Sequence, residues 1–557
     1  MKNMDTHQTT LPPPQLARAI QSWHLLVVIV IGVMAVAVAN GVVQFSTAAI
    51  CCGDYDGYYH TRFSQLLWQS IWQGGFPAKL QALPLTTWRA EVFSDHHFLF
   101  HLFLGPFIAW LGDFDGARVA TWLLACGALL ACFALILRCR LRYPLLWLFL
   151  LIGGAELFRL NMTKAISLTI ILMVLAIFVL FERRYHWLAP IAFAYVWAHN
   201  SWIMLVLLVG LWVITLVWVE RPKSLRTLAW QPLLFMGLGL VFGNIVNPFF
   251  PDNILLSYEH ARMRLFSPID ANVEVGGEWY SPPAKNFITQ MLIGSLSVGA
   301  GLLALNIRDR SSPRPIFLMA FALVLMLMTA ISQRFNEYFS IFAVLFLAFT
   351  LAPRLAGLRR MFYWSDADRR TQPLPPARED AMRMGKTLSV GWKELPVFVL
   401  MAIAMTAASV QPIAKIQFLR ELPTQQRYAA ALRWANQNMA DGELVFDDRW
   451  SDFGLLYYHT PNLKWVSGLD PYYIINYKPD LGIAYERIVK GDEPNPAQVI
   501  RQQFGVRYVF IAKPAPFQLE AIANKPKLAR TFVGQAASDK AFKLAYEDDD
   551  CLIYRLE

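Results

Sequence analysis

The chain has 557 residues, of which 56% are hydrophobic and only 16% are charged. Soluble globular proteins usually carry about 25% charged residues, so this composition excludes an ordinary soluble protein. The net charge of +10 does not indicate a nucleic-acid partner, because Lys and Arg lie mainly in short loops between apolar runs, as in proteins that fix their orientation in a membrane.

Apolar runs of roughly 17–25 residues, the length that crosses a bilayer as a helix, predict about 11 transmembrane helices. With residues 1–23 as a cytoplasmic tail, every strongly basic loop falls on the cytoplasmic side. We therefore predict a multi-pass protein of the bacterial inner (cytoplasmic) membrane. The predicted spans are His24–Val43, Ala117–Leu137, Pro144–Leu157, Ala165–Phe181, Trp187–Trp197, Trp202–Val219, Pro232–Val246, Phe287–Leu305, Pro315–Ile331, Tyr338–Leu351 and Leu395–Val410.

The apolar segment Phe98–Leu111 is not counted as a span, because it is short and contains Pro106. Counting it would place the later basic loops outside the cytoplasm, against the usual charge distribution. We interpret it as a re-entrant or interfacial helix, which is allowed where protein shields the backbone. Whether it spans the membrane stays open.

The remaining segments are loops and a tail of soluble composition. Residues 24–410 form the predicted membrane domain, with periplasmic loops at 44–116 and 247–285 and a cytoplasmic loop at 352–393. In the tail, residues 411–557, the patterns predict a helix at Gln425–Met439 and strands at Leu444–Phe446, Tyr508–Ala512 and Leu552–Tyr554. The fold class is therefore mostly α, a polytopic membrane protein with a small C-terminal α/β domain in the periplasm.

Polar and ionisable residues from separate loops gather at the predicted periplasmic ends of the helices. Ionisable groups at membrane depth are costly and usually mark a functional site, although a single Arg or Glu can also reach the interface without any function. Their convergence predicts one polar cavity at the outer interface. The residues include Asp54, Asp56, Asp95, His96, His97, Glu156, Arg159, Lys164, His199, Asn200, Glu278, Arg334 and Glu337.

Asp54 and Asp56 lie just beyond the first predicted span. Two carboxylates this close repel each other unless a cation or a donor lies between them. The stretch that follows carries Phe63 and Leu67 on one face and Trp68 beside them. This pattern is typical of a helix lying in the membrane interface, where it would wall a site that opens to lipid.

The overall order of segments resembles the GT-C superfamily of glycosyltransferases: a first helix, a long outer loop with an acidic motif and a surface helix, many further spans and a C-terminal periplasmic domain. Asp56-Gly57-Tyr58 resembles the acidic motif in the first outer loop of bacterial oligosaccharyltransferases. The segment Trp450-Ser451-Asp452-Phe453-Gly454 is similar to their Trp-Trp-Asp-Tyr-Gly signature, with the second Trp missing and Phe in place of Tyr.

The resemblance implies a sugar linked to polyprenyl phosphate or diphosphate as the donor, transfer with inversion, and a glycan, a lipid or a protein as the acceptor. A carboxylate within hydrogen-bond reach of the acceptor can act as general base, for which we expect Asp56 first and Asp54 second. The leaving phosphate needs fixed cations, for which we expect Arg334, supported by Arg159 and Lys164. Membrane lipids are the other expected partners.

Further site residues are expected around this centre. The predicted acceptor or substrate contacts are Tyr58, His60, His97, His199, Asn200, Glu337, Trp450 and Asp452. A Mg²⁺ or Mn²⁺ ion is an open alternative, because such ions prefer carboxylate oxygens. Its candidate ligands are Asp54, Asp95, His96 and Glu156.

Two other classes stay open. A lipid or sugar transporter or flippase would place ionisable groups at mid-membrane and break helices there, whereas the predicted spans are apolar at their centres. A non-catalytic envelope assembly protein with a periplasmic binding domain would not explain the clustered Asp, His and Arg residues. The one-sided distribution favours an enzyme.

Overall fold

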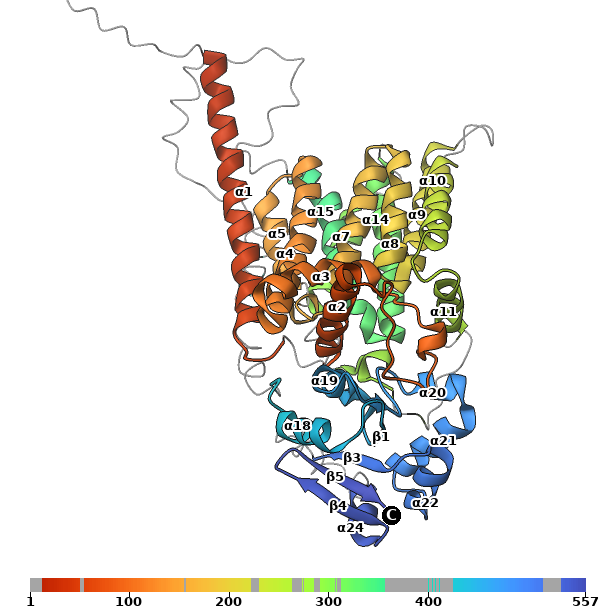
Figure 1. Cartoon of the computed structure of the whole chain (residues 1–557). Helices are drawn as coiled ribbons and strands as arrows, with labels where there is room; N and C mark the ends of the chain where they lie inside the picture. The colour runs from red at the N-terminus through yellow and green to blue at the C-terminus, as the bar shows by residue number, and fades with distance from the viewer. Residues whose placement is uncertain are drawn as a thin grey trace, which may run out of the picture.

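In the computed structural model, an upright bundle of helices carries a smaller C-terminal domain at one end (Figure 1). The predicted site residues Asp54 and Glu156, and nearly all of the predicted span Leu395–Val410, lie outside the described residues. The structure describes residues 13–50, 55–154, 157–221, 230–262, 275–284, 291–305, 312–355, 424–513 and 532–557, together with the single positions 273, 307, 399, 403, 406 and 410.

The bundle consists of apolar helices, and each of the ten predicted spans before residue 395 contains one. Five described helices are long and apolar enough to cross a membrane: Trp23–Phe45 within α1 (Pro13–Phe45), α4 (Asp113–Arg138), Asn200–Glu220 with α9 (Ile203–Glu220), α14 (Pro313–Ile331), and Gln333–Leu351 with α15 (Asn336–Leu351). Shorter members are α5 (Pro144–Gly154), α7 (Ile166–Phe181), α8 (Leu188–Ala198), α10 (Gln231–Ile245) and α13 (Leu292–Ala304).

Helix α15 lies at the centre of the bundle, since its residues from Asn336 to Thr350 are all buried. It packs against α5, α13 and α14. On the outer helices, large apolar side chains such as Met34, Ile214 and Leu303 are exposed. Such a surface would be unfavourable in water and is suited to lipid.

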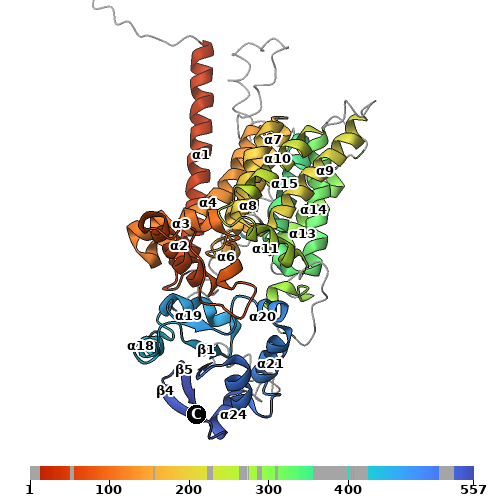
Figure 2. The same cartoon turned by 45° about the vertical axis from the view of Figure 1, so that its right-hand side comes forward.

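Two helices close the end of the bundle that faces the C-terminal domain (Figures 1 and 2). They are α2 (Asp56–Gln73) and α3 (Phe98–Leu111), which pack against each other. Only Gly112 separates α3 from α4, and a Cβ added at Gly116 would lie 2.4 Å from the carbonyl oxygen of Phe107. A glycine at this position therefore lets the two helices touch through their backbones.

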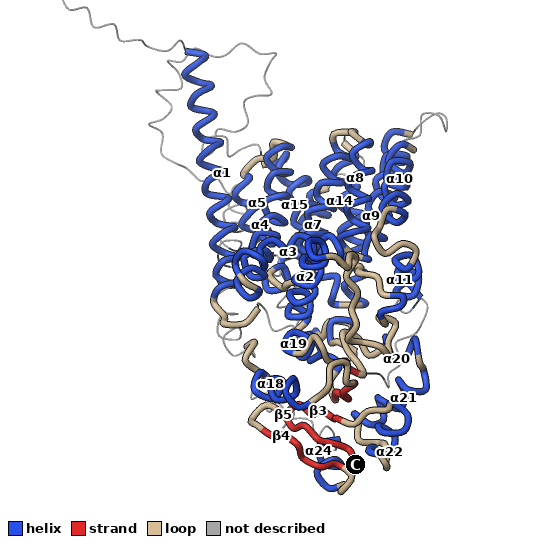
Figure 3. The backbone as a smooth tube through the Cα atoms, viewed as in Figure 1, coloured by secondary structure: helices blue, strands red, loops and turns tan. Residues whose placement is uncertain are grey.

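The C-terminal domain contains all the strands in the described part of the chain (Figure 3). They are β1 (Leu444–Asp447), β2 (Lys464–Trp465), β3 (Tyr508–Ala512), β4 (Phe542–Glu547) and β5 (Cys551–Leu556), in the order β2-β1-β3-β5-β4. Strand β1 pairs in parallel with β2 and β3, while β3-β5 and β5-β4 are antiparallel.

The remaining elements are short. The helices of the C-terminal domain are α18 (Ala429–Asn438), η10 (Trp450–Asp452), α19 (Phe453–His459), α20 (Tyr472–Tyr477), α21 (Pro479–Val489), α22 (Pro496–Val499), η11 (Ile500–Phe504) and α24 (Phe532–Ser538). Those of the bundle are η1 (Ala90–Val92), α6 (Leu157–Leu160), η2 (Tyr185–Trp187), η3 (Asn200–Trp202), α11 (Asp252–Ala261), η6 (Gly277–Trp279), η7 (Gln333–Phe335) and η8 (Ala352–Arg354).

The C-terminal domain is docked on α2 and on the start of α4. An added Cβ at Gly454, in α19, would lie 2.0 Å from the carbonyl oxygen of Tyr55. Arg427 donates a hydrogen bond from Nη1 to the hydroxyl of Tyr55 (2.8 Å), and Tyr458 donates its hydroxyl hydrogen to Oδ2 of Asp113 (2.5 Å). These contacts hold the domain directly against Tyr55, the residue before α2, and against the first residue of α4.

Candidate active site

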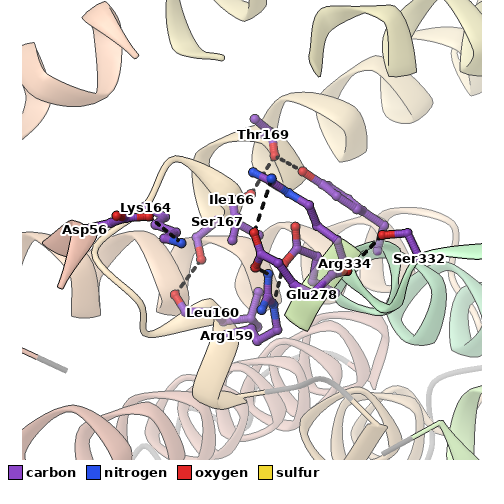
Figure 4. Close-up of polar contacts among 12 residues, drawn as sticks. Asp56, Arg159, Leu160, Lys164, Ile166, Ser167, Thr169, Glu278, Ser332 and Arg334 are labelled. Carbon is purple, nitrogen blue, oxygen red and sulfur yellow. Dashed lines mark hydrogen bonds and ion pairs between the residues drawn. The ribbon is translucent and has the colours of Figure 1, made fainter. Parts of the chain in front are cut away.

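Asp56 is the first residue of α2, and its side chain is 31% exposed. Its Oδ2 lies 3.0 Å from Nζ of Lys164 (Figure 4). Lys164 belongs to the turn between α6 and α7, where its backbone N–H donates to the carbonyl of Met162 (2.7 Å). The hydroxyl of Ser167 closes this turn by donating to the carbonyl of Leu160 (2.8 Å). The first turn of α2 and the α6–α7 turn thus present opposite charges to each other.

Two arginines lie beside this pair and share a carboxylate (Figure 4). Arg159, in α6, donates from Nη2 to Oε2 of Glu278 and from Nε to Oε2 of Glu337, both at 2.8 Å. Arg334, in η7, places Nη1 3.2 Å from Oε1 of Glu278. Glu278 therefore joins Arg159 to Arg334, although the three residues come from three separate segments.

The turn that carries Glu278 is fastened to the segment that carries Arg334. Ser332 donates its hydroxyl hydrogen to the carbonyl of Glu278 (2.9 Å), and the N–H of Gln333 donates to the carbonyl of Tyr280 (3.0 Å). The guanidinium of Arg334 also lies over the ring of Trp279, 4.6 Å from its centroid. The position of Glu278 is therefore set by the backbone as well as by charge.

Glu278 is held in its ionised form. Burial alone would raise the pKa of this carboxyl, but Arg334, Lys164 and Arg159 outweigh burial and hold the pKa well below its usual range. Within the described residues, the network pairs three cations with three carboxylates: Lys164, Arg159 and Arg334 with Asp56, Glu278 and Glu337.

A buried chain of hydrogen bonds begins one helical turn after Asp56. Nε2 of His101 lies 2.7 Å from Nδ1 of His60, and Nδ1 of His101 lies 2.7 Å from Oδ2 of Asp95. A neutral imidazole has one donor and one acceptor nitrogen. Because Nδ1 of His101 donates to Asp95, Nε2 of His101 accepts a hydrogen bond from Nδ1 of His60. Asp95 also accepts from the backbone N–H of His97 (2.9 Å). Asp95 and His60 are thus engaged with protein groups, and the predicted substrate contact of His60 stays a prediction.

Further imidazoles lie against this chain. The ring of His97 lies 3.8 Å from that of His96 and 4.9 Å from that of His199, measured between centroids. Burial lowers the pKa of all three, with neighbouring histidines adding to the effect for His96 and His97. For His199, burial together with Arg334, His260 and Lys164 lowers the pKa to about 3. These side chains are neutral near pH 7, so they offer hydrogen bonds and not charge.

The predicted substrate contacts outside the charged network differ in their surroundings. Asn200 donates to Nδ1 of His260 (2.7 Å), beside His199. Tyr58 is buried, and its ring packs on that of Tyr458 in a T-shaped geometry. Its place in the core between α2 and the C-terminal domain explains why an aromatic residue is present, and a role in substrate binding stays a prediction.

The motif from Trp450 to Gly454 reaches the site from the C-terminal domain. A Cβ built at Gly276 would lie 3.7 Å from the indole of Trp450, so this ring is next to the turn that carries Glu278. Asp452 is buried and accepts a hydrogen bond from the hydroxyl of Tyr428 (2.8 Å). Trp450 therefore lies at the edge of the charged network, while Asp452 braces the domain.

The predicted metal site has no support from the residues that can be placed. Two of its four candidate ligands, Asp54 and Glu156, lie outside the described residues. Both carboxylate oxygens of Asp95 accept hydrogen bonds from protein groups. Over the described ranges, no group of three or more His, Cys, Asp or Glu residues could hold a metal ion.

Among the predicted site residues, the structure brings Asp56, Lys164, Arg159, Arg334 and Glu337 into one network. Glu278 was expected among the polar residues at this end of the bundle but was given no specific role, although it links two of the predicted site residues. The signal in the sequence is that ionisable groups at membrane depth usually pair with one another, so the predicted arginines require carboxylate partners nearby.

Comparisons with solved structures identify the fold. The oligosaccharyltransferase of Archaeoglobus fulgidus, tethered to an acceptor peptide with an NVT sequon, aligns with a TM-score of 0.57 and 12% identity, covering 96% of this chain and 74% of that one. ArnT from Cupriavidus metallidurans, bound to undecaprenyl phosphate, aligns with a TM-score of 0.51 and 12% identity, covering 94% of this chain and 97% of that one.

These likenesses cover nearly the whole chain and show that it has the GT-C fold, as expected from the sequence resemblance. The chain is a multi-pass membrane protein like ArnT. No family model and no curated protein sequence matches it significantly. At such low identity the fold is shared while residue roles are not transferred, so function has to be inferred from the site itself.

Proposed function

We propose that the chain is a glycosyltransferase that moves a sugar or a glycan from a polyprenyl-phosphate or -diphosphate donor to an acceptor, with Asp56 as general base. The observation that carries this proposal is the network in which a partly exposed carboxylate, Asp56, lies beside three fixed cations at one end of a membrane bundle. A reaction that deprotonates a nucleophile and releases a phosphate needs these two kinds of group together. The likeness to ArnT, whose structure holds undecaprenyl phosphate, supports a lipid phosphate as the donor's leaving group.

In the proposed reaction, an acceptor O–H or N–H gives its proton to Asp56 while the acceptor atom attacks the anomeric carbon. The bond between that carbon and the phosphate oxygen breaks, and the electron pair leaves on the lipid phosphate. Lys164 orients the carboxylate of Asp56 from 3.0 Å, and Arg334 and Arg159 stabilise the charge that develops on the phosphate. Attack from the side opposite the leaving group inverts the anomeric configuration.

We also propose the sidedness and the acceptor approach. Asp113, at the start of α4, is bound to the C-terminal domain, and Arg138, at the other end of α4, pairs with Glu182 (3.0 Å). Basic residues at the end far from the site support a cytoplasmic location for that end and a periplasmic one for the C-terminal domain of a bacterial inner-membrane protein. Trp450 would contact an acceptor at the edge of the network, which its position next to Gly276 supports.

A direct test uses the full chain in lipid nanodiscs with undecaprenyl-phosphate-linked sugars as donors. Mass spectrometry of the purified protein would first identify any copurifying lipid or glycan, which narrows the choice of donor and acceptor. Release of undecaprenyl phosphate together with a glycosylated acceptor is the expected result. Movement of the intact lipid between leaflets without cleavage would instead support a flippase.

A further inference from the structure

The two arginines proposed to bind the donor's phosphate already hold a carboxylate. Glu278 lies 2.8 Å from Arg159 and 3.2 Å from Arg334. A phosphate that approaches Arg334 therefore meets a guanidinium that is already paired with a carboxylate. Since a buried cation is neutralised by its partner, the phosphate competes with that carboxylate for the guanidinium.

The three carboxylates differ in the free energy that it costs to separate each of them from its cation. Glu337 is 2% exposed and begins the buried central helix α15, so releasing it would leave a charge in the core. Asp56 pairs with Lys164 and is needed as the base. Glu278 lies on a three-residue turn and is 23% exposed. It is the one whose release costs least.

The arginines differ as well. Arg159 is 14% exposed and is fixed by two contacts of 2.8 Å, one of them to the buried Glu337. Arg334 is 27% exposed, and its 3.2 Å contact with Glu278 is the longest of the carboxylate contacts that these two arginines make in the described network. Trp279 supports the plane of this guanidinium from one side, 4.6 Å from the ring centroid, so the group stays in place when its partner changes.

We infer that Glu278 holds the place of the donor's phosphate, and that the lipid phosphate binds Arg334 by displacing the Glu278 carboxylate from that guanidinium. The inference rests on the proposed function and adds a residue that controls donor affinity. It also gives the product a way out, because the returning carboxylate competes with the undecaprenyl phosphate left after transfer. The hydrogen bond from the Ser332 hydroxyl to the backbone carbonyl of Glu278 keeps the carboxylate near its cation throughout.

The test measures the dissociation constant of undecaprenyl phosphate on the full chain in nanodiscs at low ionic strength. Glu278→Gln keeps the shape of the side chain and removes its charge, so the Kd should fall about tenfold, the effect of one charge-assisted hydrogen bond. Ser332→Ala, which only loosens the turn, should lower the Kd by a smaller factor. Arg334→Ala should raise it.

Two controls separate electrostatic exchange from a general change in the protein. Glu259→Gln removes a carboxylate of α11 that pairs with Arg262 and Asn476 and does not touch either arginine of the network. It should leave the Kd unchanged. Undecaprenol, which has the same chain but no phosphate, should bind the wild type and Glu278→Gln equally.

The outcomes are distinct. If the wild type binds undecaprenyl phosphate and Arg334→Ala weakens binding, but Glu278→Gln binds no better than the wild type, the exchange is refuted while the proposed function stands. If Glu278→Gln lowered the Kd of undecaprenol as much as that of undecaprenyl phosphate, the exchange would also be refuted, because undecaprenol has no phosphate. If the wild type does not bind undecaprenyl phosphate at all, the proposed function and the exchange both fail.

Discussion

Nζ of Lys164 lies 3.0 Å from Oδ2 of Asp56, which joins the α6–α7 turn to the first turn of α2. The lysine helps to fix the direction of a partly exposed carboxylate, and it adds positive charge next to the two arginines. Its importance should therefore exceed that of an ordinary surface ion pair, which contributes little.

Replacing Lys164 with Met should lower the kcat for sugar transfer by about 100-fold or more, the usual effect of removing one preorganised charge partner. The variant loses the group that orients Asp56 and also a positive charge near the leaving phosphate. Initial rates of sugar transfer at saturating donor, measured for the variant and the wild type, give the change in kcat. Lys490→Met, which removes the partner of Glu486 in α21, is the matched control and should keep wild-type rates. Equal rates for both variants would contradict the assignment of Lys164.

Gly454→Ala should destabilise the protein by about 1–3 kcal/mol, the usual cost of overpacking. Its Cβ would lie 2.0 Å from the carbonyl oxygen of Tyr55, so the C-terminal domain has to move away from Asp56. Thermal unfolding in detergent measures the loss. Gly534→Ala adds a Cβ with no atom within 4 Å in the same domain, and its melting temperature should stay close to that of the wild type.

Arg159→Met should cost about 3–5 kcal/mol of stability, because it leaves the buried Glu337 without its hydrogen-bonded cation. Adding Glu337→Gln in the same chain removes the stranded charge and should recover part of the loss. A double-mutant cycle of unfolding free energies measures the coupling. Additive losses would show that the two side chains do not depend on each other.

Stability should fall as the pH drops below about 6.5, the ordinary pKa of histidine. The unfolded chain takes up protons there, while burial, with Arg334, His260 and Lys164 adding to its effect, keeps the pKa of folded His199 at about 3. The contribution of His199 is complete above pH 6.5 and is lost as the pH falls toward 3. His199→Gln should make the melting temperature depend less on pH. The control is His186→Gln, which replaces an exposed histidine and should leave that dependence as in the wild type. Parallel curves for the wild type and His199→Gln would contradict burial of a neutral imidazole.

The sequence predicted the apolar helices of the bundle because the length of an apolar run is a local property. It also predicted β1, β3 and β5, because each contains a continuous apolar run: Leu444–Phe446, Tyr508–Ala512 and Leu552–Tyr554. Strand β2 has only two residues, and Leu544 of β4 is exposed, so neither carries a clear pattern. The span predicted at Leu395–Val410 lies outside the described residues.

Their positions at one end of the predicted helices were enough to predict that Asp56, Lys164, Arg159, Arg334 and Glu337 lie close together. Their pairing was not predictable, since Arg159 and Glu278 are 119 positions apart and meet only through tertiary packing. The hydrogen bonds that join Asp95 to His101 and His101 to His60 also form only through tertiary packing. Sequence spacing alone does not distinguish a histidine that faces substrate from one that is hydrogen-bonded inside the protein.

The most direct test of Asp56 as the base compares Asp56→Asn with the wild type for transfer from an undecaprenyl-phosphate-linked sugar, with undecaprenyl phosphate binding measured on the same nanodiscs. Asn keeps the size of the side chain but cannot accept the acceptor's proton, so kcat should fall by about 100- to 10,000-fold, the usual contribution of a general base. Lipid binding should persist. Wild-type turnover by a normally folded Asp56→Asn protein would contradict the account.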